Sequence, residues 1–79
     1  MKVTIYTKDD CPSCINAKRL AKEHGMDITE IKLHRDLDRN EFLAAVEKAT
    51  GGPRETVPQV ILDGTYIGGF DDFNLRMAQ

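Results

Sequence analysis

The stretch TKDDCPSC, residues Thr7 to Cys14, decides the fold of the N-terminal part of the chain. Before it, Lys2 to Tyr6 alternates polar and apolar side chains, which is the period-2 pattern of a β-strand. After it, Pro12 suits the first turn of a helix, and apolar residues recur at helical spacing until Gly25 ends the pattern. Both cysteines therefore lie where a strand passes into a helix, with Cys11 at the helix N-terminus.

This position favours redox chemistry at the cysteine pair. Unpaired backbone N–H groups and the positive end of the helix dipole stabilise a thiolate at Cys11, and Lys8 adds a cation nearby. Cys14 falls on the core-facing stripe of the helix, where it is suited to attack a mixed disulfide formed at Cys11. Pro12 stiffens the turn between the two sulfurs. We therefore predict that Cys11 attacks and Cys14 resolves.

Two carboxylates, Asp9 and Asp10, directly precede Cys11 and oppose thiolate formation. We expect both side chains in a solvated loop, where water and salt weaken their repulsion. The helix amides point at the sulfur, so their effect should outweigh that of the aspartates.

The cysteines could serve two other uses. The first is a buried, inert pair, which the position between strand and helix makes less attractive. The second is a zinc site, which needs four ligands. His24 and His34 have nine residues between them, which is not a typical ligand spacing. We therefore expect no metal.

Size and composition predict one small soluble domain over residues 1–79. Hydrophobic residues make up 41% and charged residues 30% of the chain, which is ordinary for a globular protein. A formal net charge of -2 gives no general attraction to nucleic acid. No stretch resembles a signal peptide or a membrane span. We therefore expect a cytoplasmic protein without nucleic-acid or membrane partners, in a compartment where structural disulfides are rare.

The middle of the chain predicts a strand and then a helix. Asp27 to Leu33 carries the apolar residues of a second strand. Asp38 with Glu41 three residues later resembles a capping box, and the apolar stripe that follows ends at Gly51. A second helix is therefore expected between Asp38 and Gly51.

The C-terminal part predicts a hairpin and a short helix. Val57 to Leu62 and Thr65 to Gly68 read as strands, and Asp63-Gly64 between them is a strong type I′ turn signal. Asp71 or Asp72 is expected to cap the last helix. The expected order is β-α-β-α-β-β-α, an α/β fold whose four-stranded mixed sheet is flanked by helices on both faces.

Three separated motifs carry a resemblance to a known family. They are YTKDDCPSC at Tyr6 to Cys14, ETVPQVILDG at Glu55 to Gly64 and IGGFDDF at Ile67 to Phe73. Together they closely resemble the glutaredoxins, small thiol oxidoreductases with the thioredoxin fold, over nearly the whole chain. The resemblance implies that Cys11 is the nucleophile and Cys14 the resolving thiol.

The same resemblance implies a glutathione site. The Val57-Pro58 peptide would be cis and face the cysteines, and the Val57 backbone would pair with the cysteinyl part of glutathione. Asp71 and Asp72 would receive its γ-glutamyl end, and Lys8, Arg54 or Arg39 its glycyl carboxylate. The expected glutathione-binding residues are Lys8, Thr56, Val57, Pro58, Gly69, Asp71 and Asp72.

Three positions depart from the pattern of the family. Arg76, in a short last helix, stands where the family tends to be apolar. Ser13 stands where dithiol glutaredoxins commonly have Tyr, so a wall of the ligand groove is missing. Phe70 stands where a Cys is often found.

The expected function is that of a monomeric dithiol glutaredoxin that reduces protein disulfides or glutathione mixed disulfides, with glutathione as co-substrate and no tightly bound cofactor. Two alternatives stay open. One is a glutaredoxin-like electron donor reduced by thioredoxin reductase, serving an enzyme such as ribonucleotide reductase. The other is a module that holds an iron–sulfur cluster between two protomers, with Cys11 and glutathione as ligands. Pro12 disfavours the cluster because it stiffens the loop that would have to open.

Overall fold

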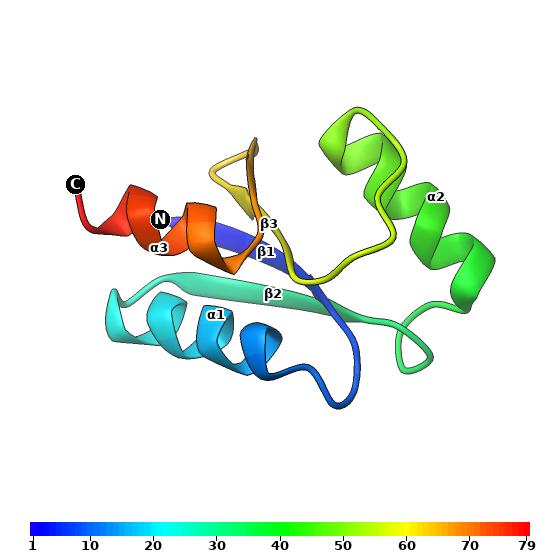
Figure 1. The fold of residues 1–79 in the computed structure, drawn as a ribbon, viewed down its shortest axis with the longest axis horizontal. Coiled ribbons are helices and arrows are strands. Elements are labelled where there is room, and N and C mark those ends of the chain that lie inside the picture. The colour runs from blue at the N-terminus through cyan, green and yellow to red at the C-terminus, as the bar shows by residue number, and fades with distance from the viewer.

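A computed structural model describes residues 1–79 and shows seven elements in the expected order (Figure 1). No helix is both long and apolar enough to cross a membrane. The elements are β1 (Lys2–Thr7), α1 (Pro12–Glu23), β2 (Asp27–Lys32), α2 (Arg39–Thr50), β3 (Gln59–Leu62), β4 (Thr65–Gly68) and α3 (Phe70–Met77).

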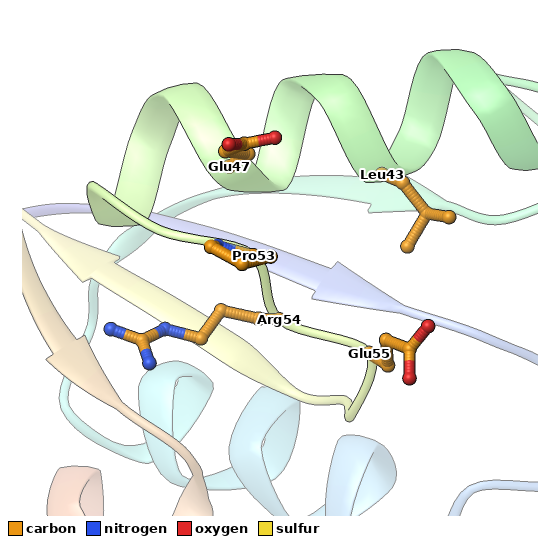
Figure 2. A pocket seen from close by; sticks show the side chains of 5 residues that line it. All are labelled: Leu43, Glu47, Pro53, Arg54 and Glu55. Carbon is orange, nitrogen blue, oxygen red and sulfur yellow. The ribbon is translucent and has the colours of Figure 1, made fainter.

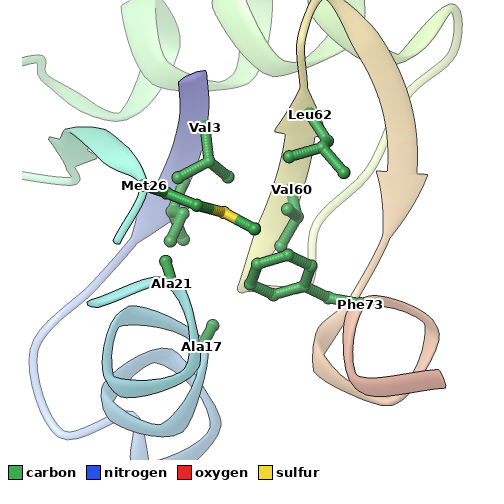
Figure 3. Packing of buried hydrophobic residues seen from close by; sticks show 8 residues of the cluster. Val3, Ala17, Ala21, Met26, Val60, Leu62 and Phe73 are labelled. Atoms are coloured by element: carbon green, nitrogen blue, oxygen red, sulfur yellow. The ribbon is translucent and has the colours of Figure 1, made fainter. Parts of the chain in front are cut away.

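The four strands form one mixed sheet in the order β2-β1-β3-β4. β1 and β2 are parallel and in register from Lys2 opposite Asp27, whereas β1 with β3 and β3 with β4 are antiparallel. Helices α1 and α3 pack over one face of the sheet and α2 covers the other, as Figures 1 and 3 show. The expected mixed sheet with helices on both faces is confirmed.

The main core lies between the sheet and helices α1 and α3 (Figure 3). Small alanines on α1 let the helix approach the strands closely, and Phe73 of α3, fully buried, fills the space beside them. The eight residues of this cluster are Val3, Ile5, Ala17, Ala21, Met26, Val60, Leu62 and Phe73.

A smaller core under α2 covers the opposite face. Tyr6 of β1 meets Phe42 of α2 edge-to-face, with 5.8 Å between ring centroids, and Val46 completes the cluster. Burial raises the pKa of the Tyr6 phenol. Because Tyr6 faces α2 while its neighbour Ile5 faces α1, the period-2 pattern of β1 separates the two cores.

The local signals at α2 and at the hairpin are confirmed. The Asp38 carboxylate accepts from the Glu41 amide at 2.9 Å, and the Glu41 carboxylate accepts from the Asp38 amide at 3.1 Å, which is a complete capping box. Gly51 ends the helix at a φ of 84°. Asp63 and Gly64 have φ values of 47° and 82°, as a type I′ turn requires.

Four boundaries differ from the sequence prediction. β1 runs one residue further, to Thr7, and β2 ends one residue earlier, at Lys32. β3 begins at Gln59 rather than Val57, since Pro58 has no N–H for the ladder. Helix α3 begins at Phe70 after a Gly69 N-cap and has no side-chain cap. The predicted capping by Asp71 or Asp72 is therefore wrong: both residues lie inside the first turn, past the position from which a cap acts.

Candidate active site

The cysteine pair lies at the start of α1 and is joined as a disulfide, so the structure shows the oxidised form. Cys11 is the N-cap residue, and the Cys14 amide donates to its sulfur at 3.2 Å. Cys11 is 7% exposed and Cys14 1%, which agrees with the prediction that Cys14 is the more buried. The hydrogen bond from the Cys14 amide would stabilise negative charge on Cys11 once the disulfide opens.

The loop before Cys11 contains an ion pair that the sequence analysis missed. Asp9 lies 2.6 Å from Lys32 at the end of β2. The hydrogen bond with Lys32, and then the charge of Lys32, lower the pKa of the Asp9 carboxyl below its usual range. Asp9 and Asp10 are both exposed, as expected. Lys32 therefore adds to solvent screening in limiting the repulsion between Asp9 and a thiolate at Cys11.

The Val57-Pro58 segment faces the cysteine pair. The peptide bond is cis, as the resemblance implied, and the Val57 carbonyl oxygen lies 3.8 Å from the Cys11 sulfur. A Cβ atom placed on Gly69 would lie 3.6 Å from the Pro58 carbonyl oxygen. The fold thus brings the start of α3 beside the segment that borders the cysteines.

Asp72 lies against the backbone at the end of β4. Gly68 has a φ of 127°, and a Cβ atom there would lie 2.9 Å from Asp72 Cγ and overlap the carboxylate oxygen. A side chain at this position would therefore strain the backbone and displace the Asp72 carboxylate. Gly69, Asp71 and Asp72 therefore come together at the first turn of α3, next to Pro58.

Three cationic side chains, those of Lys8, Arg54 and Arg39, are the candidates to bind a ligand carboxylate. Lys8 is exposed in the loop before the cysteines. The Arg54 guanidinium lies 5.4 Å from the ring centroid of Tyr66, and Arg39 is an exposed residue at the start of α2. No ion pair holds any of the three cations. Of the three, Lys8 is the nearest in sequence to Cys11.

A hydrogen-bonded group at the end of β1 also escaped the sequence analysis. The buried Thr7 hydroxyl donates to the Glu30 carboxylate at 2.7 Å, and Lys18 lies 3.0 Å from the same carboxylate. Burial would raise the pKa of Glu30, but the Thr7 hydrogen bond and then Lys18 outweigh it, so the pKa is lowered. The group anchors β1 directly before the cysteine loop.

A pocket of about 200 Å³ opens between α2 and the irregular segment that joins α2 to β3 (Figure 2). Its lining includes neither cysteine. No three His, Cys, Asp or Glu side chains gather where they could share a metal ion. The pocket is lined by Leu43, Glu47, Pro53, Arg54 and Glu55.

The sheet order, the helices on both faces and the CPSC pair at the start of α1 define the class of thioredoxin-fold thiol–disulfide oxidoreductases. The Glutaredoxin family model matches residues 3–67, which is most of the chain. The chain belongs to the glutaredoxin family.

Individual relatives agree with this assignment. The chain is 37% identical over 70 residues to glutaredoxin-C6 of Oryza sativa subsp. japonica, covering 89% of the chain and 61% of that relative. It is 39% identical over 70 residues to glutaredoxin 3 of Escherichia coli (strain K12), covering 89% and 78%. It is 40% identical over 76 residues to the hybrid peroxiredoxin hyPrx5 of Haemophilus influenzae, covering 96% of the chain but 29% of that protein.

Solved structures show the same fold. A buckwheat glutaredoxin–glutathione complex is 29% identical with a TM-score of 0.79, over 96% of this chain and 67% of that one. The reduced Escherichia coli glutaredoxin is 26% identical with a TM-score of 0.81, over 99% and 94%.

Proposed function

We propose that this chain is a dithiol glutaredoxin, a glutathione-dependent oxidoreductase that reduces protein disulfides or glutathione mixed disulfides. One observation carries the proposal: Cys11 caps α1 with its sulfur beside the Cys14 amide and 3.8 Å from the Val57 carbonyl. This arrangement combines a stabilised thiolate, a resolving thiol and a backbone edge for a substrate strand.

The reaction follows thiol–disulfide exchange. The Cys11 thiolate attacks the glutathione sulfur of a mixed disulfide, a new Cys11–glutathione disulfide forms and the substrate leaves as a thiolate. Glutathione then resolves this intermediate, releasing oxidised glutathione and the Cys11 thiolate. In the dithiol route Cys14 attacks instead and releases glutathione, and two further glutathione molecules reduce the Cys11–Cys14 disulfide. Each exchange forms one S–S bond and breaks one.

Several features support glutathione as the reductant. The buckwheat relative is a glutathione complex. In this chain the first turn of α3 offers backbone N–H groups to a carboxylate, and Asp72 beside Gly68 offers an acceptor for an ammonium group. Lys8, exposed in the loop before Cys11, adds a cation. These groups complement a zwitterionic peptide whose thiol lies between its charged ends.

Ser13 favours one rival. It is exposed next to Cys11 and lacks the aromatic ring that would form a wall of the ligand groove. The rival is a donor reduced by thioredoxin reductase, serving a partner such as ribonucleotide reductase.

Turnover of a glutathionylated peptide with glutathione and glutathione reductase tests the proposal. We expect the wild type and Cys14→Ser to turn over and Cys11→Ser to be inactive, because only Cys11 has to attack. Reduction of the disulfide by thioredoxin reductase, with no turnover in the glutathione assay, would instead establish the rival. A coloured protein purified without oxygen, with absorbance lost in Cys11→Ser, would favour the iron–sulfur alternative.

We also propose that the protein acts as a monomer in the cytoplasm. The reaction requires a reducing glutathione pool, and the cytosol maintains one. Fractionation of the source cells and sedimentation of the reduced protein test the two parts of this proposal.

A further inference from the structure

The segment that carries Val57 past Cys11 has no secondary structure of its own. No backbone–backbone hydrogen bond ties any of residues 52 to 58 to the rest of the chain. An irregular segment samples many conformations unless other contacts hold it. Side chains must therefore determine the orientation of the Val57 peptide beside Cys11.

The Gln59 side chain holds this segment. Its Nε2 donates to the Thr56 carbonyl oxygen at 2.8 Å and lies 3.2 Å from the Thr56 hydroxyl oxygen. Gln59 is 4% exposed, and as the first residue of β3 it pairs with Tyr6 of β1. The amide therefore connects the irregular segment to the rigid sheet.

Tyr66 fixes the orientation of that amide. Its hydroxyl donates from β4 to Gln59 Oε1 at 2.6 Å, which leaves Nε2 to face Thr56. The Arg54 guanidinium lies 5.4 Å from the Tyr66 ring centroid, and Figure 2 shows the Arg54 side chain extending away from Glu55. Tyr66 thus contacts both the start of the segment and, through Gln59, its end.

We propose that Gln59 is a positioning residue for the redox reaction: through Thr56 it holds the Val57 backbone in the orientation that pairs with the main chain of a substrate cysteine. The inference rests on the proposed function. Gln59 touches neither the substrate nor the sulfurs and acts only through Thr56 and Val57. Recognition by main-chain groups suits mixed disulfides of varied sequence, because every peptide carries the same backbone.

Gln59→Glu is the decisive variant. It keeps the size of the side chain and the acceptor for Tyr66, but it replaces the donor to the Thr56 carbonyl with an oxygen that repels it. We expect kcat/KM for a glutathionylated peptide to fall about tenfold. Alkylation of reduced Cys11 by iodoacetamide should stay within about twofold of wild type, because this small reagent does not need the Val57 backbone.

Thr50→Val is the matched control. The Thr50 hydroxyl oxygen lies 2.8 Å from the Val46 carbonyl oxygen and 2.9 Å from the Gly52 carbonyl oxygen, so the variant removes hydrogen bonding at the far end of the same segment. We expect its peptide kcat/KM to match wild type. If Gln59→Glu does not fold, Tyr66→Phe replaces it, with an expected fall of about threefold from loss of the amide's anchor.

The results of these assays distinguish a failure of the inference about Gln59 from a failure of the proposed function. Unchanged peptide kcat/KM in the folded variant overturns the inference and leaves the function intact. Equal losses of peptide turnover and alkylation also overturn it, because Gln59 would then act on Cys11 or on the whole fold. A wild type that does not turn over the peptide refutes the proposed function, and with it the inference, before any variant is compared.

Discussion

Replacing Thr7 by Val should destabilise the protein at neutral pH. The substitution keeps the branched shape of a side chain that is 1% exposed but deletes the hydroxyl that donates to the Glu30 carboxylate at 2.7 Å. A hydrogen bond to a charged group contributes about 1.5–3 kcal/mol, and Lys18 still pairs with Glu30, so we expect a loss of about 2 kcal/mol. For a domain of this size that lowers Tm by roughly 8–16 °C.

The loss should depend on pH. The pKa of Glu30 is lowered in the folded protein from its ordinary value of 4.5: burial acts to raise it, but the Thr7 hydrogen bond and Lys18 prevail. The resulting stability is fully present above the unfolded pKa and disappears as pH falls through the lower folded pKa. Because Thr7→Val removes one cause of the lowering, the difference from wild type should be largest at neutral pH and shrink below about pH 4.

Thermal unfolding followed by circular dichroism, once at neutral pH and once below about pH 4, measures the effect. Thr29→Val is the control, since Thr29 lies on the same strand as Glu30 but is exposed and makes no side-chain hydrogen bond. We expect this control within about 0.5 kcal/mol of wild type at either pH. Equal losses in the two variants, or a Thr7→Val loss that is the same at both pH values, would refute the reasoning.

Three further predictions concern the fold and the site. Phe73→Ala should cost about 3–5 kcal/mol in denaturant unfolding because the ring is fully buried, whereas Leu75→Ala at a 64% exposed position should change little. Asp38→Ala should cost about 1 kcal/mol in the same assay through loss of the capping box. Gly68→Ala should displace the Asp72 carboxylate and raise KM for glutathione several-fold in the assay coupled to glutathione reductase. An unchanged KM would show that Asp72 does not bind glutathione.

Most of the fold could be predicted because its signals are local. The alternation of Lys2 to Tyr6, the proline at the start of α1, the capping box at Asp38 and the Asp63-Gly64 turn each act within a few residues. The errors at β3 and α3 also have local causes, namely the missing N–H of Pro58 and the earlier start of the helix after Gly69.

Other features of the site depend on long-range pairing. Lys32 reaches Asp9 because β1 and β2 run parallel and end at the same edge of the sheet, beside the loop. The hydrogen bond from Tyr66 to Gln59 requires the register of β4 on β3, whereas the bond from Gln59 to Thr56 joins residues three apart. A glutamine within the apolar run Val57 to Leu62 was the only signal in the sequence for this network, and it did not reveal the partners.

The sequence by itself determined that Cys11 would lie at a helix N-terminus, where the helix dipole favours a thiolate, because Cys11, Pro12 and Cys14 are neighbours in the chain and the dipole acts over one turn. Only the tertiary structure decided what faces that sulfur. Val57 is 46 residues away from Cys11, and antiparallel pairing of β3 with β1 carries it to the same edge of the sheet. Reactivity is therefore local in origin, whereas substrate pairing depends on the order of the strands.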